Sequence, residues 1–308
     1  MGYEFMGFHR PDGRVGARNL VGVIPSVTCA NDVAQAIVTE VQGTVGYFHH
    51  QGCCQLPPDL DRVTATLTSL GQSPNLGAVL IVSLGCEGTD FEQMYKTIEA
   101  SGKPVRIIGI QELGGVSNAI QKGIDLAREL VMEISGQQRQ PAPIDKAVMA
   151  IKCGASDTTS GMASNCVIGY IADRMVDLGA TVIFGETTEF IGGEHLLARR
   201  AVTPEVGQKI FDIVNAMETR AKSLGCDMRK GQPTPGNIAG GLSSIEEKTL
   251  GAIVKSGTRP IQGVLEYCDK ITDQKGLWIK DAPGREPEIL TGMAATGAQF
   301  MMFSTGRG

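Results

Sequence analysis

The chain has 308 residues, of which 42% are hydrophobic and 20% are charged, so it can bury a core and is not intrinsically disordered. Its length exceeds that of one ordinary core and predicts two domains. The net charge of −5, without a basic cluster, excludes the electrostatic footprint of a protein that binds nucleic acid or an acidic membrane.

The start of the chain lacks the basic and apolar regions of a signal peptide, and no apolar run is long enough to span a membrane. We therefore expect a cytoplasmic protein. In a reducing compartment its eight cysteines are more readily explained by metal binding or catalysis than by disulfides.

The first half of the chain alternates apolar, strand-like runs with helical patterns. The expected strands are residues 19–25, 44–48, 77–84 and 104–110, and the expected helices are residues 30–41, 60–70, 91–100 and 116–134. This alternation predicts an α/β fold in which a parallel sheet carries helices on both faces. The polar, proline-bearing segment 136–143 is the expected linker, so we predict two α/β domains, residues 1–138 and 144–308.

The second half begins with an expected strand at residues 147–151, whose end leads into the most informative loop of the chain. Residues 152–161 hold a thiol, four hydroxyls and a carboxylate, among them Cys153, Ser156 and Asp157. Reactive groups are often placed at such strand ends, because the strand is rigid and the loop is free to carry chemistry. Further elements are expected at residues 167–178, 181–185, 204–224 and 299–303.

Four cysteines follow expected strands: Cys29, Cys53, Cys86 and Cys153. His49 lies close to Cys53 in the sequence. Because the carboxyl ends of parallel strands share one edge, the first three could converge, with Cys153 closing the site from the second domain. This set suits iron or zinc, although its spacing is not that of a zinc ribbon. Alternatively, these cysteines are small buried core residues.

A second cluster follows the strand at 181–185 and contains Glu186, Glu189, Glu194 and His195. Carboxylates and an imidazole in this position predict proton transfer, and His195 could also bind a metal. The alternative is a solvated helix start, where Glu is favoured.

A third cluster is the glycine-rich segment 232–244, which includes Asn237, Gly240 and Gly241 and leads to Lys248. Its backbone N–H groups could hold an anion, and Lys248 could pair with a substrate carboxylate. Arg307, near the end of the chain, is a natural fork for a carboxylate. The alternative is a loop that leads into a helix capped by Ser244, with Glu247 completing a capping box.

Motifs along the whole chain resemble the altronate/galactarate dehydratase family. They are residues 13–19, 49–55, 85–87, 153–157 with 160–161 and Asn165, 186–195, 235–237 with 239–241, 247–248 with 250–251, and 303–308. The resemblance implies a lyase that removes water from a sugar acid such as altronate or galactarate and depends on iron or another divalent metal. It also implies that Cys29, Cys53, Cys86 and Cys153 match cysteines of these dehydratases.

The sequence departs from the family pattern in several ways. From the resemblance we expect the small N-terminal domain and a C-terminal piece after Gly308 to be missing, and Ala155 replaces a usual Gly and Cys166 a usual Pro. The second half is also similar to the large subunit of sulfolactate sulfo-lyase, which eliminates sulfite and carries its small domain on a separate subunit. The cysteines of the first half favour the dehydratases.

The expected mechanism is β-elimination, in which a base removes the proton α to a carboxylate and electrostatic stabilisation lowers the barrier. We expect Fe(II) or another divalent metal, or else an iron–sulfur cluster, at Cys53, Cys86 and Cys153, with His49 and Cys29 as further candidates. The expected catalytic residues are His195, Glu186, Glu189, Lys248 and Asp157, and the expected substrate-binding residues are Ser156, Asn237, Gly240, Gly241 and Arg307.

The expected partners are a small sugar acid, a possible separate small subunit and further copies of the chain. One rival interpretation is a regulatory subunit that is inactive without its partner. A second is a nucleotide-dependent oxidoreductase, but the chain lacks a Gly-x-Gly-x-x-Gly turn after the first strand.

Overall fold

A computed structural model describes residues 2–306 and divides the chain into two compact units. The N-terminal unit is Glu4–Ala142, and the C-terminal unit runs from Pro143 onward and includes the first residues of the chain.

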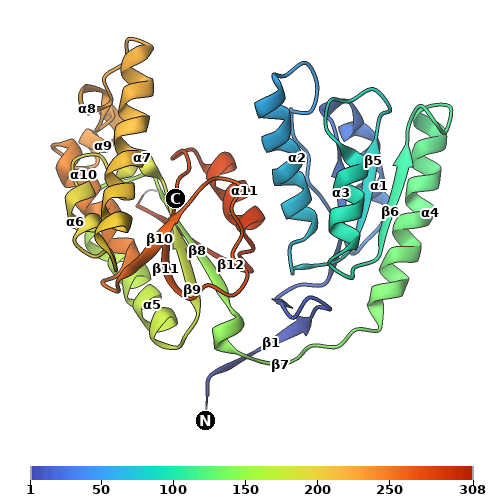
Figure 1. Ribbon diagram of the computed structural model, residues 1–308, viewed down its shortest axis with the longest axis horizontal. Helices are drawn as coiled ribbons and strands as arrows, with labels where there is room; N and C mark the ends of the chain where they lie inside the picture. The colour runs from blue at the N-terminus through green and yellow to red at the C-terminus, as the bar shows by residue number, and fades with distance from the viewer. Residues whose placement is uncertain (1, 307–308) are drawn as a thin grey trace. The chain divides into compact units, whose positions relative to one another are not determined.

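The N-terminal unit contains a four-stranded parallel sheet in the order β4-β3-β5-β6. Its strands are β3 (Leu20–Pro25), β4 (Thr44–Gly46), β5 (Leu76–Ser83) and β6 (Val105–Gly109). Every residue of β5 is buried, as expected for a strand covered on both faces. Helices α1 (Asn31–Glu40) and α4 (Val116–Ser135) pack together on one face, and α2 (Pro57–Gly71) and α3 (Phe91–Glu99) on the other (Figure 1). The predicted fold class is confirmed.

A second, small sheet in this unit has the order β2-β1-β7, formed by β1 (Glu4–His9), β2 (Val15–Gly16) and β7 (Gln140–Pro143). The expectation that residues 136–143 are only a linker is therefore wrong for its last four residues. Pairing with a strand at the opposite end of the sequence orders this segment, and one of its contacts joins His9 Nε2 to the Pro141 carbonyl at 3.1 Å. A local pattern of polar residues and prolines gives no sign of such a distant partner.

The C-terminal unit is built on a five-stranded parallel sheet in the order β10-β11-β9-β8-β12. The strands are β8 (Val148–Gly154), β9 (Thr181–Phe184), β10 (Ile261–Leu265), β11 (Gly276–Lys280) and β12 (Phe300–Thr305). Strands β10 and β11 were not predicted. Strand β8 has β9 on one side and β12 on the other, so the chain reverses its direction of winding there. Ligands of open α/β sheets bind at such a point, beyond the carboxyl ends of the strands.

Helices cover this sheet on both faces. Helices α5 (Asn165–Asp177) and α7 (Pro204–Ser223) share one core with the sheet, and α11 (Glu286–Thr296) packs on the other face (Figure 1). Shorter helices are α6 (Glu194–Ala198), α8 (Met228–Gly231), α9 (Pro235–Ala239) and α10 (Ile245–Ile253). Single turns complete the unit: η2 (Ile144–Lys146), η3 (Ser160–Ser164), η4 (Thr187–Glu189) and η5 (Val254–Ser256). In the N-terminal unit, η1 (Thr28–Ala30) leads into α1.

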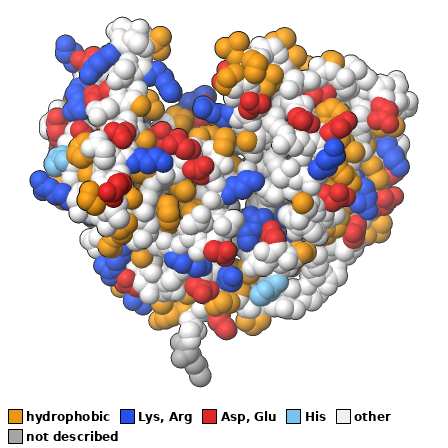
Figure 2. Space-filling model, in the orientation of Figure 1, with side chains coloured by type: hydrophobic (Ala, Val, Ile, Leu, Met, Phe, Trp, Pro, Cys, Tyr) orange, Lys and Arg blue, Asp and Glu red, His pale blue; other side chains and the backbone are white. Residues whose placement is uncertain are grey.

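No helix within residues 2–306 has both the length and the apolar character that crossing a bilayer requires. On the face drawn in Figure 2, basic and acidic side chains are interspersed, and the basic ones form no continuous stripe.

Candidate functional site

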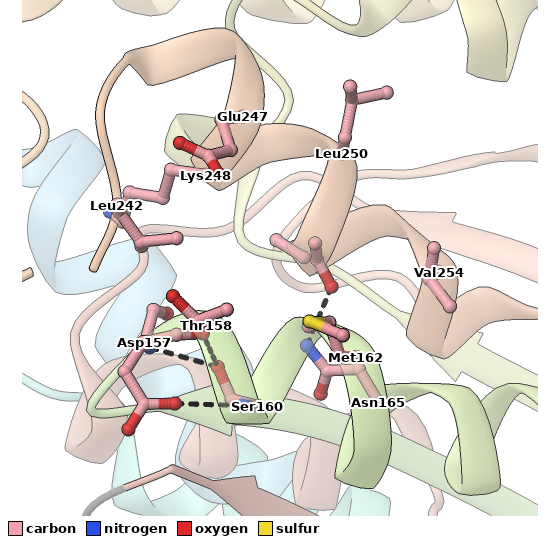
Figure 3. A pocket seen from close by; sticks show the side chains of 14 residues that line it. Asp157, Thr158, Ser160, Met162, Asn165, Leu242, Glu247, Lys248, Leu250 and Val254 are labelled. Atoms are coloured by element: carbon pink, nitrogen blue, oxygen red, sulfur yellow. Dashed lines mark hydrogen bonds between the residues drawn. The ribbon is translucent and has the colours of Figure 1, made fainter. Parts of the chain in front are cut away.

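The loop after β8 is tied into a fixed shape by Asp157. The Asp157 carboxylate accepts a hydrogen bond from the Ser160 N–H at 2.8 Å, and the Asp157 N–H donates to Ser160 Oγ at 3.0 Å (Figure 3). The carboxylate also accepts from the Thr159 hydroxyl at 2.8 Å. A Cβ on Gly306, at the end of β12, would lie 2.2 Å from Asp157 Oδ1. The carboxylate therefore lies in the crevice between β8 and β12, where the chain reverses, and only glycine fits beside it.

A cavity of about 270 Å³ opens next to this loop, between the turn that starts α5 and helix α10. Ser156, Asp157 and Lys248 are among the residues that line it (Figure 3). It is also lined by Asn165, which the sequence reasoning did not select as a site residue. Thr158, Ser160 and Glu247 line it as well, so the structure brings two acidic, one basic and several neutral polar side chains to one cavity at the carboxyl end of the sheet.

Lys248 is held in place by two acceptors from distant parts of the chain. Its ammonium lies 3.0 Å from Glu189 Oε1 and 2.8 Å from Gln232 Oε1. The second carboxylate oxygen of Glu189, Oε2, is buried and has no hydrogen-bond partner among the described residues. Because unpaired buried acceptors are rare and costly, this oxygen is available to accept a proton or a hydrogen bond from a ligand.

Behind this pair lies a fully buried group of charges. Glu186 Oε1 is 2.8 Å from the Lys152 ammonium, and Glu186 Oε2 is 2.6 Å from that of Lys255. Lys255 also donates to Cys153 Sγ at 3.1 Å, and Lys152 reaches Glu286 at 3.1 Å. Glu186 has a φ of +75°, a left-handed conformation that is unfavourable for a non-glycine residue. Strain of this kind persists only where the surroundings enforce it, and it clusters at functional sites.

The charges in this group are set by the contacts around Glu186. Burial alone would lower the pKa of Lys255, but Cys153 and Glu186 beside it raise that pKa above its ordinary value. Burial raises the pKa of Cys153 to about 11, although the ammonium of Lys255 opposes this. Cys153 is therefore a neutral thiol at neutral pH, and the carboxylate of Glu186 keeps Lys255 protonated.

The glycine-rich segment lies against the Asp157 loop, but its amides are already bonded. Asn237 donates to the Ser156 carbonyl at 2.8 Å, and the Thr158 N–H donates to the Gly240 carbonyl at 3.1 Å. The N–H groups of Gly240 and Gly241 donate to carbonyls of the same segment. These amides are therefore not free to hold an anion as expected. The segment supports the loop instead, and Ser244 caps α10 as the alternative interpretation proposed.

Three predicted catalytic residues are not among those that line this cavity within the described part of the chain: Glu186, Glu189 and His195. Glu189 is linked to the cavity through its contact with Lys248. His195 is exposed on α6 and is not among the residues that line the cavity. Arg307 lies outside the described residues, so its predicted role stays a prediction.

The N-terminal unit gathers exposed thiols at the carboxyl end of its own sheet. Cys29, Cys53, Cys54 and Cys86 are all exposed, and they follow β3, β4 and β5. Backbone hydrogen bonds from Thr28 to Gln51 and from Gly88 to Gly52 join the three loops. Cys53 Sγ lies 3.5 Å from Cys54 Sγ, and this contact, with smaller effects of Cys29 and Cys86, raises the pKa of Cys53.

These donors do not form a metal site as they are arranged. Within residues 2–306, no three His, Cys, Asp or Glu side chains lie in positions that could hold a metal ion. His49 uses both ring nitrogens: Nε2 bonds the Pro25 carbonyl at 2.8 Å, and Nδ1 accepts from the Gln51 N–H at 3.2 Å. Cys153 belongs to the C-terminal unit and bonds an ammonium.

The contacts thus give His49 and Cys153 roles other than the predicted metal binding, because neither offers a free donor. Metal binding by the exposed Cys29, Cys53 and Cys86 stays a prediction. Thiols of this kind suit a soft metal, but they would have to rearrange to share one.

Three charged or polar residues of the C-terminal unit were missed by the sequence reasoning: Lys152, Lys255 and Gln232. A signal for the lysines was present. Lys152 lies inside an apolar strand and Lys255 in an apolar helical run, and a lysine buried in such a place needs a carboxylate partner. Gln232 carries no comparable signal, because its position in a loop does not reveal its neighbour.

Comparison with known proteins agrees with this arrangement of two units. The family model described as "D-galactarate/Altronate dehydratase, C-terminal" matches residues 144–308. The model described as "D-galactarate dehydratase/Altronate hydrolase, second domain" matches residues 7–135.

Curated relatives match nearly the whole chain. The (2R)-sulfolactate sulfo-lyase subunit beta of Chromohalobacter salexigens is 39% identical over 311 residues, which cover 100% of this chain and 78% of the relative. Altronate dehydratase of Bacillus subtilis is 31% identical over 99% of this chain and 62% of its own length. Galactarate dehydratase (L-threo-forming) of Escherichia coli is 32% identical over 100% of this chain and 62% of its own length. The chain therefore belongs to the D-galactarate/altronate dehydratase family of lyases.

Proposed function

We propose that the chain eliminates water from a sugar acid such as altronate or galactarate, at the cavity beside Asp157 and Lys248. The observation that supports this most is the Lys248–Glu189 pair, because it joins a cation that lines the cavity to a carboxylate with one unpartnered oxygen. Elimination β to a carboxylate needs a base and a nearby positive charge.

In this proposal Glu189, which does not line the cavity but bonds Lys248 there, is the base that removes the proton α to the substrate carboxylate, through Oε2. The α proton is weakly acidic, so negative charge that develops on the substrate carboxylate must be stabilised. The Lys248 ammonium, fixed by Glu189 and Gln232, is positioned to do this without reorganising. Asp157, which lines the cavity, is the candidate acid that donates a proton to the leaving hydroxyl, so that the hydroxyl departs as water.

The buried group around Glu186 positions this base. The Glu189 N–H donates to the Glu186 carbonyl at 2.7 Å, so the two residues are the ends of one tight turn, η4. Lys152 and Lys255 hold Glu186 from both sides. The left-handed turn at Glu186 and the position of Glu189 are thereby fixed together.

The family resemblance also implies iron or another divalent metal. We derive no step from it, because the described residues form no group that could hold one. Metal dependence is a separate part of the proposal, tested by metal analysis of the protein itself.

A second candidate is elimination of sulfite from sulfolactate. It is favoured by the identity of 39% to a sulfo-lyase subunit and by the 78% of that relative which the chain covers. That relative is named as a subunit, which supports a separate partner chain for this protein too. Both reactions remove a leaving group β to a carboxylate, so the same base and cation serve either one.

The test is a substrate panel. The anaerobically purified chain, with and without a candidate small subunit, is incubated with galactarate, altronate and sulfolactate, and 2-keto product and sulfite are measured. 2-Keto product from galactarate or altronate, with no sulfite released from sulfolactate, supports the dehydratase. Sulfite release from sulfolactate alone replaces it with the second candidate. Absence of product in every combination contradicts both.

A further inference from the structure

Asn165 is a buried amide on the wall of the cavity, and one end of this amide is unused. The residue begins α5 and is only 2% exposed, yet it is among those that line the cavity (Figure 3). Its Nδ2 donates to the Gly251 carbonyl of α10 at 2.7 Å. Its Oδ1 is buried and has no hydrogen-bond partner among the described residues. A buried acceptor without a partner is costly, so it indicates a group that is supplied from outside the chain.

The contact with Gly251 determines which end of the amide is free. If the Asn165 amide were turned over, its oxygen would face the oxygen of the Gly251 carbonyl, and two acceptors cannot bond each other. The nitrogen therefore belongs on the α10 side, where it satisfies a carbonyl in the last turn of that helix. The free end is an oxygen, which only accepts. A ligand group that pairs with it must donate a hydrogen bond, as a hydroxyl does, whereas a carboxylate or a sulfonate carries only acceptors at neutral pH.

The turn that precedes Asn165 is also unusual. The Asn165 N–H donates to the Ser160 carbonyl, five residues back, where an α-helix would bond the fourth residue back. Turn η3 is therefore a π-turn, a rare form that is frequently found at functional sites. The wider turn redirects the side chains that follow it. A Cβ on Gly251 would lie 3.3 Å from Gly161 Cα, so η3 and α10 touch, and Asn165 can reach the main chain of α10.

Asn165 and the charged residues of the proposed function lie at different ends of the cavity. Asp157 comes before η3 and Asn165 after it, which separates them by roughly 10 Å along the helix axis. In Figure 3 Asp157 and Lys248 lie to one side of the view and Asn165 to the other, next to the apolar Met162 and Val254. A few well-placed polar groups on an apolar wall fix the orientation of a ligand. Asn165 is such a group at the end of the cavity away from the reacting carbons.

We propose that Asn165 is a substrate-binding residue whose Oδ1 accepts a hydrogen bond from a hydroxyl on the far part of the substrate chain, beyond the carbons that react. This role rests on the proposed function and narrows the substrate to a polyhydroxy acid long enough to span the cavity. Such an acid places its carboxylate near Lys248, and a hydroxyl further along its chain meets Asn165. An acid without that hydroxyl leaves Oδ1 unpaired, and sites of this kind discriminate strongly against ligands that lack the hydrogen-bonding group.

The test measures binding by calorimetry to the full chain carrying Glu189→Gln, so that the acids are not consumed, together with any partner subunit that the panel identifies. The ligands are galactarate and altronate, each compared with the acid of the same chain length without hydroxyls, adipate and hexanoate. Asn165→Leu is similar in size but lacks the acceptor, and we expect it to weaken binding of the sugar acid by about 10- to 100-fold. Binding of adipate or hexanoate should stay within about twofold. Sulfolactate, whose chain is too short to reach Asn165 from Lys248, should be equally unaffected.

The matched control is Asn118→Leu, which removes an exposed amide of the N-terminal unit that donates to the Leu113 carbonyl at 2.9 Å. It should change no binding constant. Asn165→Ala is measured beside Asn165→Leu, and denaturant unfolding verifies that each variant is folded. One comparison needs no substitution at Asn165: the chain that retains it should bind galactarate at least about 10-fold more tightly than adipate. Equal binding of these two acids overturns the role of Asn165.

The outcomes separate this role from the proposed function. If the sugar acids bind, and the Asn165 variants bind them as tightly as Asn118→Leu does, the role of Asn165 is overturned and the proposed function stands. An equal loss for adipate means that Asn165 only shapes the cavity, and an equal loss for sulfolactate places its contact beside the reacting carbons. Either result also overturns the role. If no sugar acid binds any of these chains, the proposed function is contradicted and the role of Asn165 falls with it.

Discussion

Cysteines lie at or beyond the carboxyl ends of strands in both units, but their surroundings differ. Cys29, Cys53 and Cys86 of the N-terminal unit are exposed and have other thiols as neighbours. Cys153 of the C-terminal unit is 2% exposed and lies between an ammonium and a carboxylate. A cysteine near the carboxyl end of a parallel strand therefore has different chemistry in the two units.

The difference teaches that strand-end position alone does not define a site. In the N-terminal unit the loops are held by polar groups such as Glu87, which accepts from the Ser26 hydroxyl and from the N–H groups of Leu84 and Gly85, and the thiols stay exposed. In the C-terminal unit the strand end is filled by the buried charges around Glu186. The next turn holds Glu189, which pairs with Lys248 through Oε1 and leaves Oε2 without a partner among the described residues. We therefore place the chemistry in the C-terminal unit.

The largest expected effect is on turnover. Glu189→Gln keeps the shape of the side chain but removes the proposed base, so we expect kcat to fall by about 10²- to 10⁴-fold with little change in KM. Steady-state kinetics on the substrate identified by the panel measures this. The matched control is Glu99→Gln, an exposed carboxylate of the N-terminal unit bonded to Tyr95. Equal kcat values for Glu189→Gln and the unmodified chain would remove Glu189 from the mechanism.

The next effect is on stability. Glu186→Gln leaves Lys152 and Lys255 buried without their shared carboxylate, and we expect the free energy of unfolding to fall by about 3 to 5 kcal/mol. Glu87→Gln in the N-terminal unit changes a more exposed carboxylate that accepts neutral donors, and should cost about 1 to 2 kcal/mol. Denaturant unfolding of each variant gives both values. A larger loss for Glu87→Gln would reverse the comparison between the units.

A smaller effect concerns pH. Burial raises the pKa of Cys153 from 9.0 to about 11 in the folded chain. A raised pKa means that the folded state holds the proton more tightly, so this contribution to stability is complete below pH 9 and is lost as the pH rises toward 11. The unfolding free energy should therefore fall more steeply between these pH values in the unmodified chain than in Cys153→Ala. Parallel pH profiles for the two proteins would show that the thiol titrates normally.

The smallest expected effect is on the iron content of the Cys153 variant, which should not change. Cys153→Ser is expected to leave the iron content of anaerobically purified protein unchanged, because Cys153 binds Lys255. Cys53→Ser, which alters the exposed thiols, is expected to lower any iron that is bound. Iron is measured on both proteins by plasma mass spectrometry. Loss of iron in Cys153→Ser alone would restore Cys153 as a ligand.

Much of the fold could be predicted because its core strands are apolar runs with clear ends, as at β5 and β8. Strands β10 and β11 were missed, since glycine and polar residues such as Gln262 and Lys280 interrupt their apolar pattern. Of the site, Asp157, Glu186, Glu189 and Lys248 could be selected as charges that follow apolar elements. Their pairing could not, because Lys255 meets Glu186, and Gln232 meets Lys248, only through the folded chain.

The most direct test of the account follows the substrate's α proton by nuclear magnetic resonance in deuterated water. With the substrate and any partner subunit identified by the panel, we expect the unmodified chain to remove this proton during turnover. Glu189→Gln should remove it at least about 100-fold more slowly. Lys248→Met, which lacks the ammonium, should bind the acid more weakly than the unmodified chain does. Loss of the α proton at an unchanged rate in Glu189→Gln would contradict the assignment of the chemistry to the Glu189–Lys248 pair.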